Sequence, residues 1–203
     1  MSRGLGDVYK RQQKAENTVG VLLGNGWYNQ RDRTVEGCMW YDTPRLLCQL
    51  EIEYTDGSTE LVVTDDSWKT TTGPLLHDAI FTGEEYDARL ELDGWNRNGY
   101  KDSSWKKALL VRAPKGSLHA QLAPHEKIIR ILQPVSCEQK DDSTYWYAFP
   151  EMISGWAHIK VQGNAGDRIK LRFVGEEKND FGQVDLYTLR IGMHDFCNQT
   201  FLV

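Results

Sequence analysis

Apolar and polar residues alternate with a period of two along much of the chain, which is the pattern of β-strands that bury one face. The clearest example is the segment 47–68, LCQLEIEYTDGSTELVVTDDSW, in which Leu50 and Ile52 alternate with glutamine and glutamate. Asp56 and Gly57 lie at the centre of this segment, and such a pair accommodates the positive φ angles of a tight turn. The pattern therefore predicts a β-hairpin.

The same period returns in the segment 156–174, WAHIKVQGNAGDRIKLRFV. Ile159 and Val161 alternate with polar residues before a glycine-containing turn at 163–166, and Ile169 resumes the alternation after it. This arrangement predicts a second hairpin. Because the two segments lie in opposite halves of the chain, we expect both halves to be antiparallel β-structure.

A proline- and glycine-containing connector separates the two halves. The segment 111–128, VRAPKGSLHAQLAPHEKI, interrupts strand pairing, and we place a domain boundary near residue 124. The predicted fold class is all-β, with two antiparallel, jelly-roll-like β-sandwich domains. The first covers residues 13–123, and the second, which we expect to be incomplete, covers residues 124–203.

One short segment departs from the two-residue period. Residues 102–110, DSSWKKALL, place Asp102 or Ser103 where an N-cap residue would stand, so we expect a short helix there. No other part of the chain sustains a helical period over several turns.

The two ends of the chain differ from its interior. Residues 1–12 contain GLGDVYKRQ, which resembles a translated sequencing-adapter sequence found at the ends of gene fragments assembled from environmental DNA. We expect a non-native leader here and exclude it from the fold prediction. At the other end, QTFLV (199–203) is an apolar run without a polar tail, which indicates a strand that has been cut. A missing natural N-terminus would leave the compartment of the protein open.

Composition excludes several classes of partner. The 24 lysines and arginines are outnumbered by 29 aspartates and glutamates, giving a net charge of -5, and no basic stripe is present that could neutralise phosphates. We therefore expect no nucleic-acid partner. No apolar run approaches the roughly 20 residues needed to cross a bilayer, so no membrane span is expected. The four cysteines have neither CxxC nor metal-ligand spacing, which favours free thiols.

The acidic stretch TGEEYDARLE (82–91) is the most concentrated set of ionisable residues in the chain. If the stretch is a strand, its residues divide between two faces. The inward face would hold Glu84, Tyr86, Ala88 and Leu90, and the outward face would hold Glu85, Asp87, Arg89 and Glu91. On this interpretation Arg89 lies between two acids, and the simplest function of the stretch is a solvated face that sets strand register.

Other motifs give weaker signals. GVLLGNGWYNQ (20–30) is rich in glycine but lacks the Lys-Ser/Thr of a phosphate loop, and the five histidines form no HExxH motif. No GxSxG motif is present either. Four aromatic residues have two interpretations, because they could stack on a sugar ring or fill a sandwich core. They are Trp27, Tyr28, Trp40 and Tyr41.

The order of short motifs over 66–105 resembles the N-terminal module of bacterial α-L-rhamnosidases of glycoside hydrolase family 78. Several motifs in the same order are a far stronger signal than any one of them. In order they are Trp68-Lys69, Thr72-Gly73-Pro74, Gly83-Glu84-Glu85-Tyr86-Asp87-Ala88-Arg89, Gly94-Trp95 and Asp102-Ser103-Ser104-Trp105.

The resemblance extends beyond the connector. Residues 145–177 are similar to the β domain that follows in these enzymes, and DLYTLRIG (185–192) resembles the next segment. The resemblance implies that the second domain is concanavalin-like. Before Gly155-Trp156 the family commonly has an Asp-Phe-Gly-Gln type of segment, and residues 149–154 depart from it here. The departure indicates a divergent branch and leaves the substrate preference open.

The resemblance implies that this chain holds no catalytic residues. Family members cleave by inversion, with carboxylates in a helical barrel downstream of both β domains, and that barrel is absent here. An inverting acid and base lie roughly 6.5–9.5 Å apart around one sugar, which neighbouring acids in 82–91 do not satisfy by proximity in sequence. Two functions remain open: a non-catalytic N-terminal part of an α-L-rhamnosidase that supports the barrel, or a free-standing carbohydrate-binding or interaction protein.

Similar modules bind rhamnose with the help of calcium, so the resemblance also implies candidate binding residues in this chain. Calcium takes hard oxygen ligands, and His77-Asp78 and the acidic stretch supply candidates. The ligand would be a rhamnose-containing glycan or glycoside. The candidate sugar-binding residues are Trp27, Asp78, Glu84, Glu85, Asp87 and Trp95, and the candidate calcium ligands among them are Asp78, Glu84 and Asp87.

Overall fold

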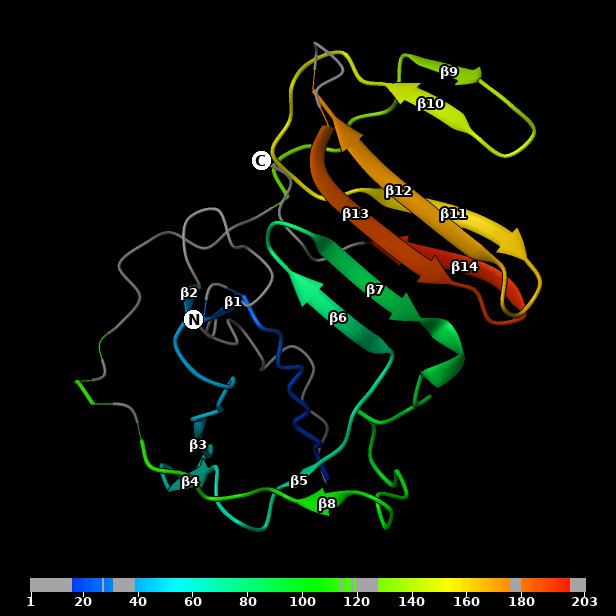
Figure 1. Cartoon of the computed structure of the whole chain (residues 1–203). Helices are drawn as coiled ribbons and strands as arrows, with labels where there is room; N and C mark the ends of the chain where they lie inside the picture. Colours follow the sequence, from blue (N-terminus) through cyan, green and yellow to red (C-terminus); the bar gives the residue numbers. More distant parts are fainter. Residues whose placement is uncertain are drawn as a thin grey trace.

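The computed structural model describes residues 16–26, 28–30, 39–113, 115–117, 119, 128–175 and 180–197. These residues form fourteen β-strands and a single turn of 3-10 helix, η2 (Ala88–Leu90), and hold no α-helix (Figure 1). The all-β prediction is therefore confirmed. The strands are β1 (Asn29–Gln30), β2 (Met39–Trp40), β3 (Gln49–Glu53), β4 (Thr59–Val63), β5 (Lys69–Thr70), β6 (Leu75–Ala79), β7 (Gly83–Asp87), β8 (Lys106–Lys107), β9 (Ser136–Gln139), β10 (Tyr145–Ala148), β11 (His158–Gly163), β12 (Arg168–Val174), β13 (Asp180–Thr188) and β14 (Gly192–Cys197).

A four-stranded sheet joins the two halves of the chain. Its strand order is β12-β13-β7-β6, so that the green pair β6 and β7 lies beside the orange pair β12 and β13 in Figure 1. β7 and β13 run parallel, with Glu85 opposite Leu186 and Tyr86 opposite Tyr187, and the other two pairings are antiparallel. The domain boundary predicted near residue 124 falls within 120–127, which lie outside the described residues, and the division into two domains stays a prediction.

The buried core of the described residues is small and lies on this sheet. It is formed by Ala88, Tyr187 and Leu189. Four half-buried side chains pack against it, and two of these come from β11, which pairs with β14 in a separate two-stranded sheet. The four are Tyr86, Ile159, Val161 and Ile169. The core therefore lies where β11 meets the four-stranded sheet.

The first predicted hairpin is confirmed. β3 and β4 pair antiparallel from Gln49 opposite Val63 to Glu53 opposite Thr59. Gly57 has a φ of 81° in the turn between them, which is the conformation that favoured glycine there.

The second predicted hairpin is only partly right. The strands form as β11 and β12, but β11 pairs with β14 and β12 pairs with β13. The turn between them is tied to the end of β13 instead, because Gly166 donates to the Leu189 carbonyl and Leu189 donates to the Asp167 carbonyl. The turn thus passes the chain from one sheet to the other.

The predicted helix at 102–110 is wrong. The segment contains a turn, in which Trp105 donates to the Asp102 carbonyl, and then strand β8, which pairs with β5. Ala108 continues the pairing by donating to the Trp68 carbonyl at 2.8 Å, and Lys69 Nζ lies 2.7 Å from Asp102 Oδ1. Contacts with a distant segment override the local helix signal here.

Two further predictions from the sequence can be compared with the structure. Cys48 and Cys137 are free thiols, as expected. Tyr28 and Tyr41 stack with their ring centroids 6.0 Å apart, yet Tyr41 is 68% exposed, so this ring does not fill a core. Within the part of the chain that the structure describes, no helix is long and apolar enough to cross a membrane.

Candidate functional site

The acidic stretch forms a strand only as far as Asp87. At that point the backbone turns into η2, and the Asp87 carboxylate accepts a hydrogen bond from the Arg89 backbone N–H at 3.0 Å. The prediction of one continuous strand is therefore wrong beyond Asp87. Because the 3-10 turn breaks the alternation, Ala88 is buried as predicted but Leu90 is 47% exposed.

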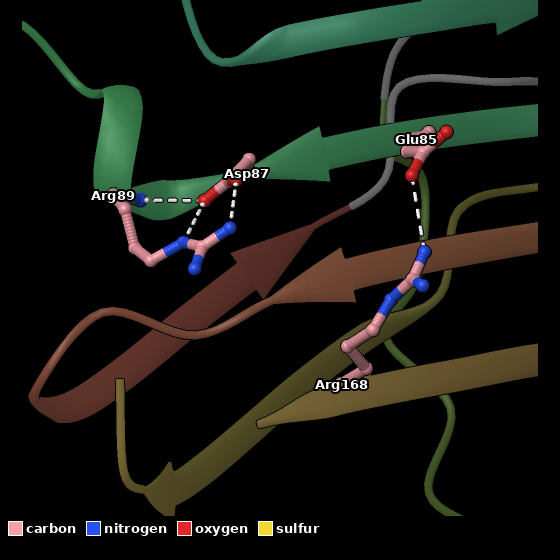
Figure 2. Close-up of polar contacts among 4 residues, drawn as sticks. All are labelled: Glu85, Asp87, Arg89 and Arg168. Carbon is pink, nitrogen blue, oxygen red and sulfur yellow. Dashed lines mark hydrogen bonds and ion pairs between the residues drawn. The ribbon is translucent and has the colours of Figure 1, made fainter. Parts of the chain in front are cut away.

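The Arg89 side chain is bound to a single acid. Its Nε and Nη2 lie 2.9 and 2.7 Å from the two carboxylate oxygens of Asp87, a two-point geometry that suits guanidinium and carboxylate (Figure 2). The prediction that Arg89 lies between Asp87 and Glu91 is therefore only partly confirmed, because these bonds of its side chain run to Asp87. These hydrogen bonds from Arg89 hold the pKa of the Asp87 carboxyl below its usual value.

Glu85 and Glu84 connect β7 to the second half of the chain in different ways. The Glu85 carboxylate lies 3.0 Å from Arg168 Nη2 at the start of β12, as Figure 2 shows. Glu84 uses its backbone, because its N–H donates to Asp185 Oδ1 on β13 at 3.0 Å. Asp185 is 1% exposed and was not a candidate from the sequence. Asp185 stands at a polar position of the alternation Gln183-Val184-Asp185-Leu186, so the sequence did not mark it as buried.

A second cluster follows the stretch. Tyr86 and Tyr187 stack across β7 and β13 with centroids 5.3 Å apart, and the Tyr86 hydroxyl lies 3.0 Å from Glu91 Oε1. The other Glu91 oxygen pairs with Arg190 Nη1 at 3.0 Å, and Asp93 pairs with the same nitrogen. Burial, reinforced by the nearby Glu91 charge, raises the pKa of the Tyr86 hydroxyl. This cluster again joins the first half of the chain to the second.

Asp78 and Trp95, two further candidates, contact the N-terminal segment. Asp78 accepts hydrogen bonds from the backbone N–H and the side-chain amide of Asn25, both at 2.6 Å. The Trp95 ring lies against Gly20 so closely that an added Cβ on Gly20 would be 2.3 Å from it. Trp27 lies outside the described residues. Asp78 and Trp95 therefore both hold the segment that precedes β1.

The structure places Asp78 opposite Glu84 across β6 and β7, but it does not bring all three candidate calcium ligands of the described residues to one centre. Asp78 is bound by Asn25 and Asp87 by Arg89, and in the described part of the chain no three His, Cys, Asp or Glu residues form a group that could hold a metal ion. The described residues therefore supply no gathered set of three calcium ligands. The calcium and rhamnose sites stay predictions, which calorimetry with L-rhamnose, with and without calcium, tests.

The Asp87 carboxylate makes the stability of the chain depend on pH. Because its folded pKa is depressed, its contribution is present above the ordinary value of 3.8 and is lost as the pH falls through the folded pKa. We expect Asp87→Asn to lower stability at neutral pH and to remove this part of the acid-induced loss. Urea unfolding between neutral and acidic pH measures it. The control Glu85→Gln removes an exposed ion pair and should keep the loss; an unchanged pH profile in Asp87→Asn would contradict the assignment.

Comparison with known proteins identifies the family of this chain. Residues 5–130 match the model of the α-L-rhamnosidase N-terminal domain, which is more than half of the chain. The chain belongs to this family. The match begins within residues 1–12 and ends just beyond the connector.

The relatives of this N-terminal domain protein are much longer than the chain. An α-L-rhamnosidase of Alteromonas sp. (strain LOR) is 33% identical over 86% of the chain, which covers 19% of that relative. The solved α-L-rhamnosidase from Dictyoglumus thermophilum is 33% identical with a TM-score of 0.72, over 79% of this chain and 20% of that one. The Streptomyces avermitilis α-L-rhamnosidase complexed with L-rhamnose is 26% identical with a TM-score of 0.75, over 87% and 18%. The chain thus spans about a fifth of the length of these relatives.

Proposed function

We propose that the chain is a non-catalytic N-terminal part of an α-L-rhamnosidase that supports the domain carrying the catalytic residues. The whole enzyme would cleave terminal α-L-rhamnosyl residues from glycosides by inversion. The observation that carries the proposal is the family match over residues 5–130, in a chain that spans about a fifth of its relatives. The ion pairs of the acidic stretch support it, because charged groups that are already bound to one another are poor candidates for acid and base catalysis.

The role proposed for the acidic stretch is to hold the two halves of the chain in one body. Glu85 with Arg168, and Glu91 with Arg190, connect residues that are about 80 to 100 positions apart. We further propose that the four-stranded sheet and the β11-β14 sheet are the two layers of a β-sandwich. The packing of Ile159 and Val161 against the core on the four-stranded sheet supports this.

A hybrid enzyme tests the proposed function. Residues 16–197 would replace the similar segment of the Dictyoglumus thermophilum α-L-rhamnosidase, and a truncated enzyme without that segment serves as the control. We expect the hybrid to cleave an aryl rhamnoside and the truncated enzyme to lose most of its activity, because the catalytic part loses its support. A hybrid no more active than the truncated enzyme would contradict the proposal.

The chain alone should be inactive on the same substrate. If it did turn over the aryl rhamnoside, and Glu84→Gln or Asp87→Asn abolished that turnover, the acidic stretch would be catalytic after all. The alternative of a free-standing carbohydrate-binding or interaction protein predicts that the chain has no effect on the truncated enzyme, whether fused or added.

A further inference from the structure

The hairpin β9-β10 exposes aromatic side chains on both of its faces. Its strands pair antiparallel, with Tyr145 opposite Gln139 and Tyr147 opposite Cys137. Tyr145 and Tyr147 share one face, where they are 50% and 59% exposed, and Trp146 points to the other face with 41% exposed. We call residues 135–149 the aromatic hairpin. It projects from the sheets at the top of Figure 1.

The segments that flank the aromatic hairpin add to its apolar surface. Val135 and Phe149 stand at its two ends and are 66% and 43% exposed. Further large hydrophobic side chains nearby in sequence are more than half exposed: Ile128, Ile129, Ile131 and Met152. Large exposed apolar patches usually mark interaction sites, whereas single exposed hydrophobic residues do not.

A two-stranded hairpin with this surface is not stabilised by its own pairing. Isolated hairpins are marginally stable in water and need a third strand or a packed face. Among the described elements, the strong contacts of β9 and β10 are with each other. Removing water from exposed aromatic rings is favourable, so a surface that covers them would stabilise the hairpin.

Two of the four charged side chains of the aromatic hairpin pair with each other, and the other two, Asp141 and Asp142, give its turn a negative charge. Lys140 pairs with Glu138, and Lys140 Nζ also lies 5.3 Å from the centre of the Trp146 ring. Arg130 pairs with Glu151 at the base. An aromatic centre with a charged rim is the composition of protein–protein interfaces. The partner therefore needs an apolar surface opposite the aromatic centre.

The two exposed faces favour a protein over a sugar as the occupant. An aromatic platform for a sugar ring needs one face packed on the body of the protein, so that the other is held rigid for stacking. Here aromatic rings are exposed on both faces, Tyr145 and Tyr147 on one and Trp146 on the other. A protein can enclose both, and the relatives provide one, because about four-fifths of their length lies outside the segment that this chain matches.

We infer that the aromatic hairpin is a docking surface for the part of the full-length α-L-rhamnosidase polypeptide that lies outside the matched segment. This inference rests on the proposed function and names the partner surface within it. Tyr145, Tyr147 and Phe149 insert between apolar side chains of that polypeptide, and the Lys140–Glu138 pair stays at the rim.

Hydrogen exchange in the hybrid enzyme tests the docking. We expect the amides of 145–149 to exchange fast in the chain alone and slower by about tenfold or more in the hybrid, because exchange then requires release of the docked hairpin. The double variant Tyr145→Ser/Tyr147→Ser should lose this protection in the hybrid. The control Tyr41→Ser removes a tyrosine that is 68% exposed on another surface, and this variant should keep the protection.

The outcomes separate the docking from the proposed function. An active hybrid with fast exchange at 145–149 would overturn the docking and leave the proposed function intact. An inactive hybrid with slow exchange at 145–149 would support the docking and contradict the proposed function. Two results with the chain alone would also overturn the inference, because a different partner would then cover the hairpin. One is protection that accompanies dimerisation, detected by analytical ultracentrifugation. The other is protection on addition of a rhamnose-containing polysaccharide. If the hybrid does not fold, the chain is mixed with the separately purified truncated enzyme, and a lack of added protection counts against the docking.

Discussion

Replacing Gly83 with alanine should lower the free energy of unfolding by about 2–5 kcal/mol, from backbone strain and from a steric clash. Gly83 has a φ of 101°, which favours glycine, and it begins β7 where that strand meets β13. An added Cβ would lie 2.1 Å from the Val184 carbonyl oxygen and 2.7 Å from Asp185 Oδ1. To make room, β7 and β13 must separate, and the bond from the Glu84 N–H to Asp185 is then weakened.

Gly94→Ala is the matched control for this variant. Gly94 has a φ of 80°, so alanine there brings similar backbone strain, but its added Cβ would meet nothing within 4 Å. We expect it to cost about 1–2 kcal/mol. Urea denaturation of both variants measures the difference, which is the cost of the clash. Equal losses in the two variants would show that β7 and β13 do not approach as closely as described.

Leu189→Ala should lower the free energy of unfolding by about 2–5 kcal/mol, because the small core loses its largest fully buried apolar side chain. Leu189 is 1% exposed and lies in the core with Ala88 and Tyr187. Its Cδ1 also lies so close to Gly163 that no Cβ fits there, so the surroundings are tightly packed. The backbone of Leu189 holds the turn at Gly166 and Asp167 as well, and a shifted strand end would disturb both sheets.

Ile191→Ala provides the comparison, since Ile191 lies two residues further along and is 83% exposed. Its truncation should change stability by no more than about 0.5 kcal/mol. Thermal and urea unfolding followed by tryptophan fluorescence report both variants. Similar effects at 189 and 191 would mean that the core is not centred on Leu189.

Local features of the fold could be predicted from the sequence. The hairpin at 47–68 follows from alternation and an Asp-Gly turn, and both signals act between neighbouring residues. The strands β11 and β12 follow from alternation too. The strands with which β11 and β12 pair could not be predicted in this way. The alternation of side chains indicates which face of a strand is buried, but it does not indicate which strand lies next to it.

Features that depend on distant contacts could not be predicted. The 102–110 segment becomes a strand because it pairs with β5, and β7 ends at Asp87 because that carboxylate binds the Arg89 backbone and side chain. The candidate site residues were chosen for their carboxylates. Their observed partners include Asn25 and Arg168, which no local motif connects to them.

The parallel pairing of β7 with β13 has a consequence for synthesis of the protein on the ribosome. The two strands are about 100 residues apart, as the bond from Glu84 to Asp185 shows. At 5–20 residues per second, roughly 5–20 s pass between the emergence of β7 and that of its neighbour. During this interval β7 has β6 on one side and an open edge on the other. The order of translation therefore delays completion of this sheet until the second half of the chain has been made.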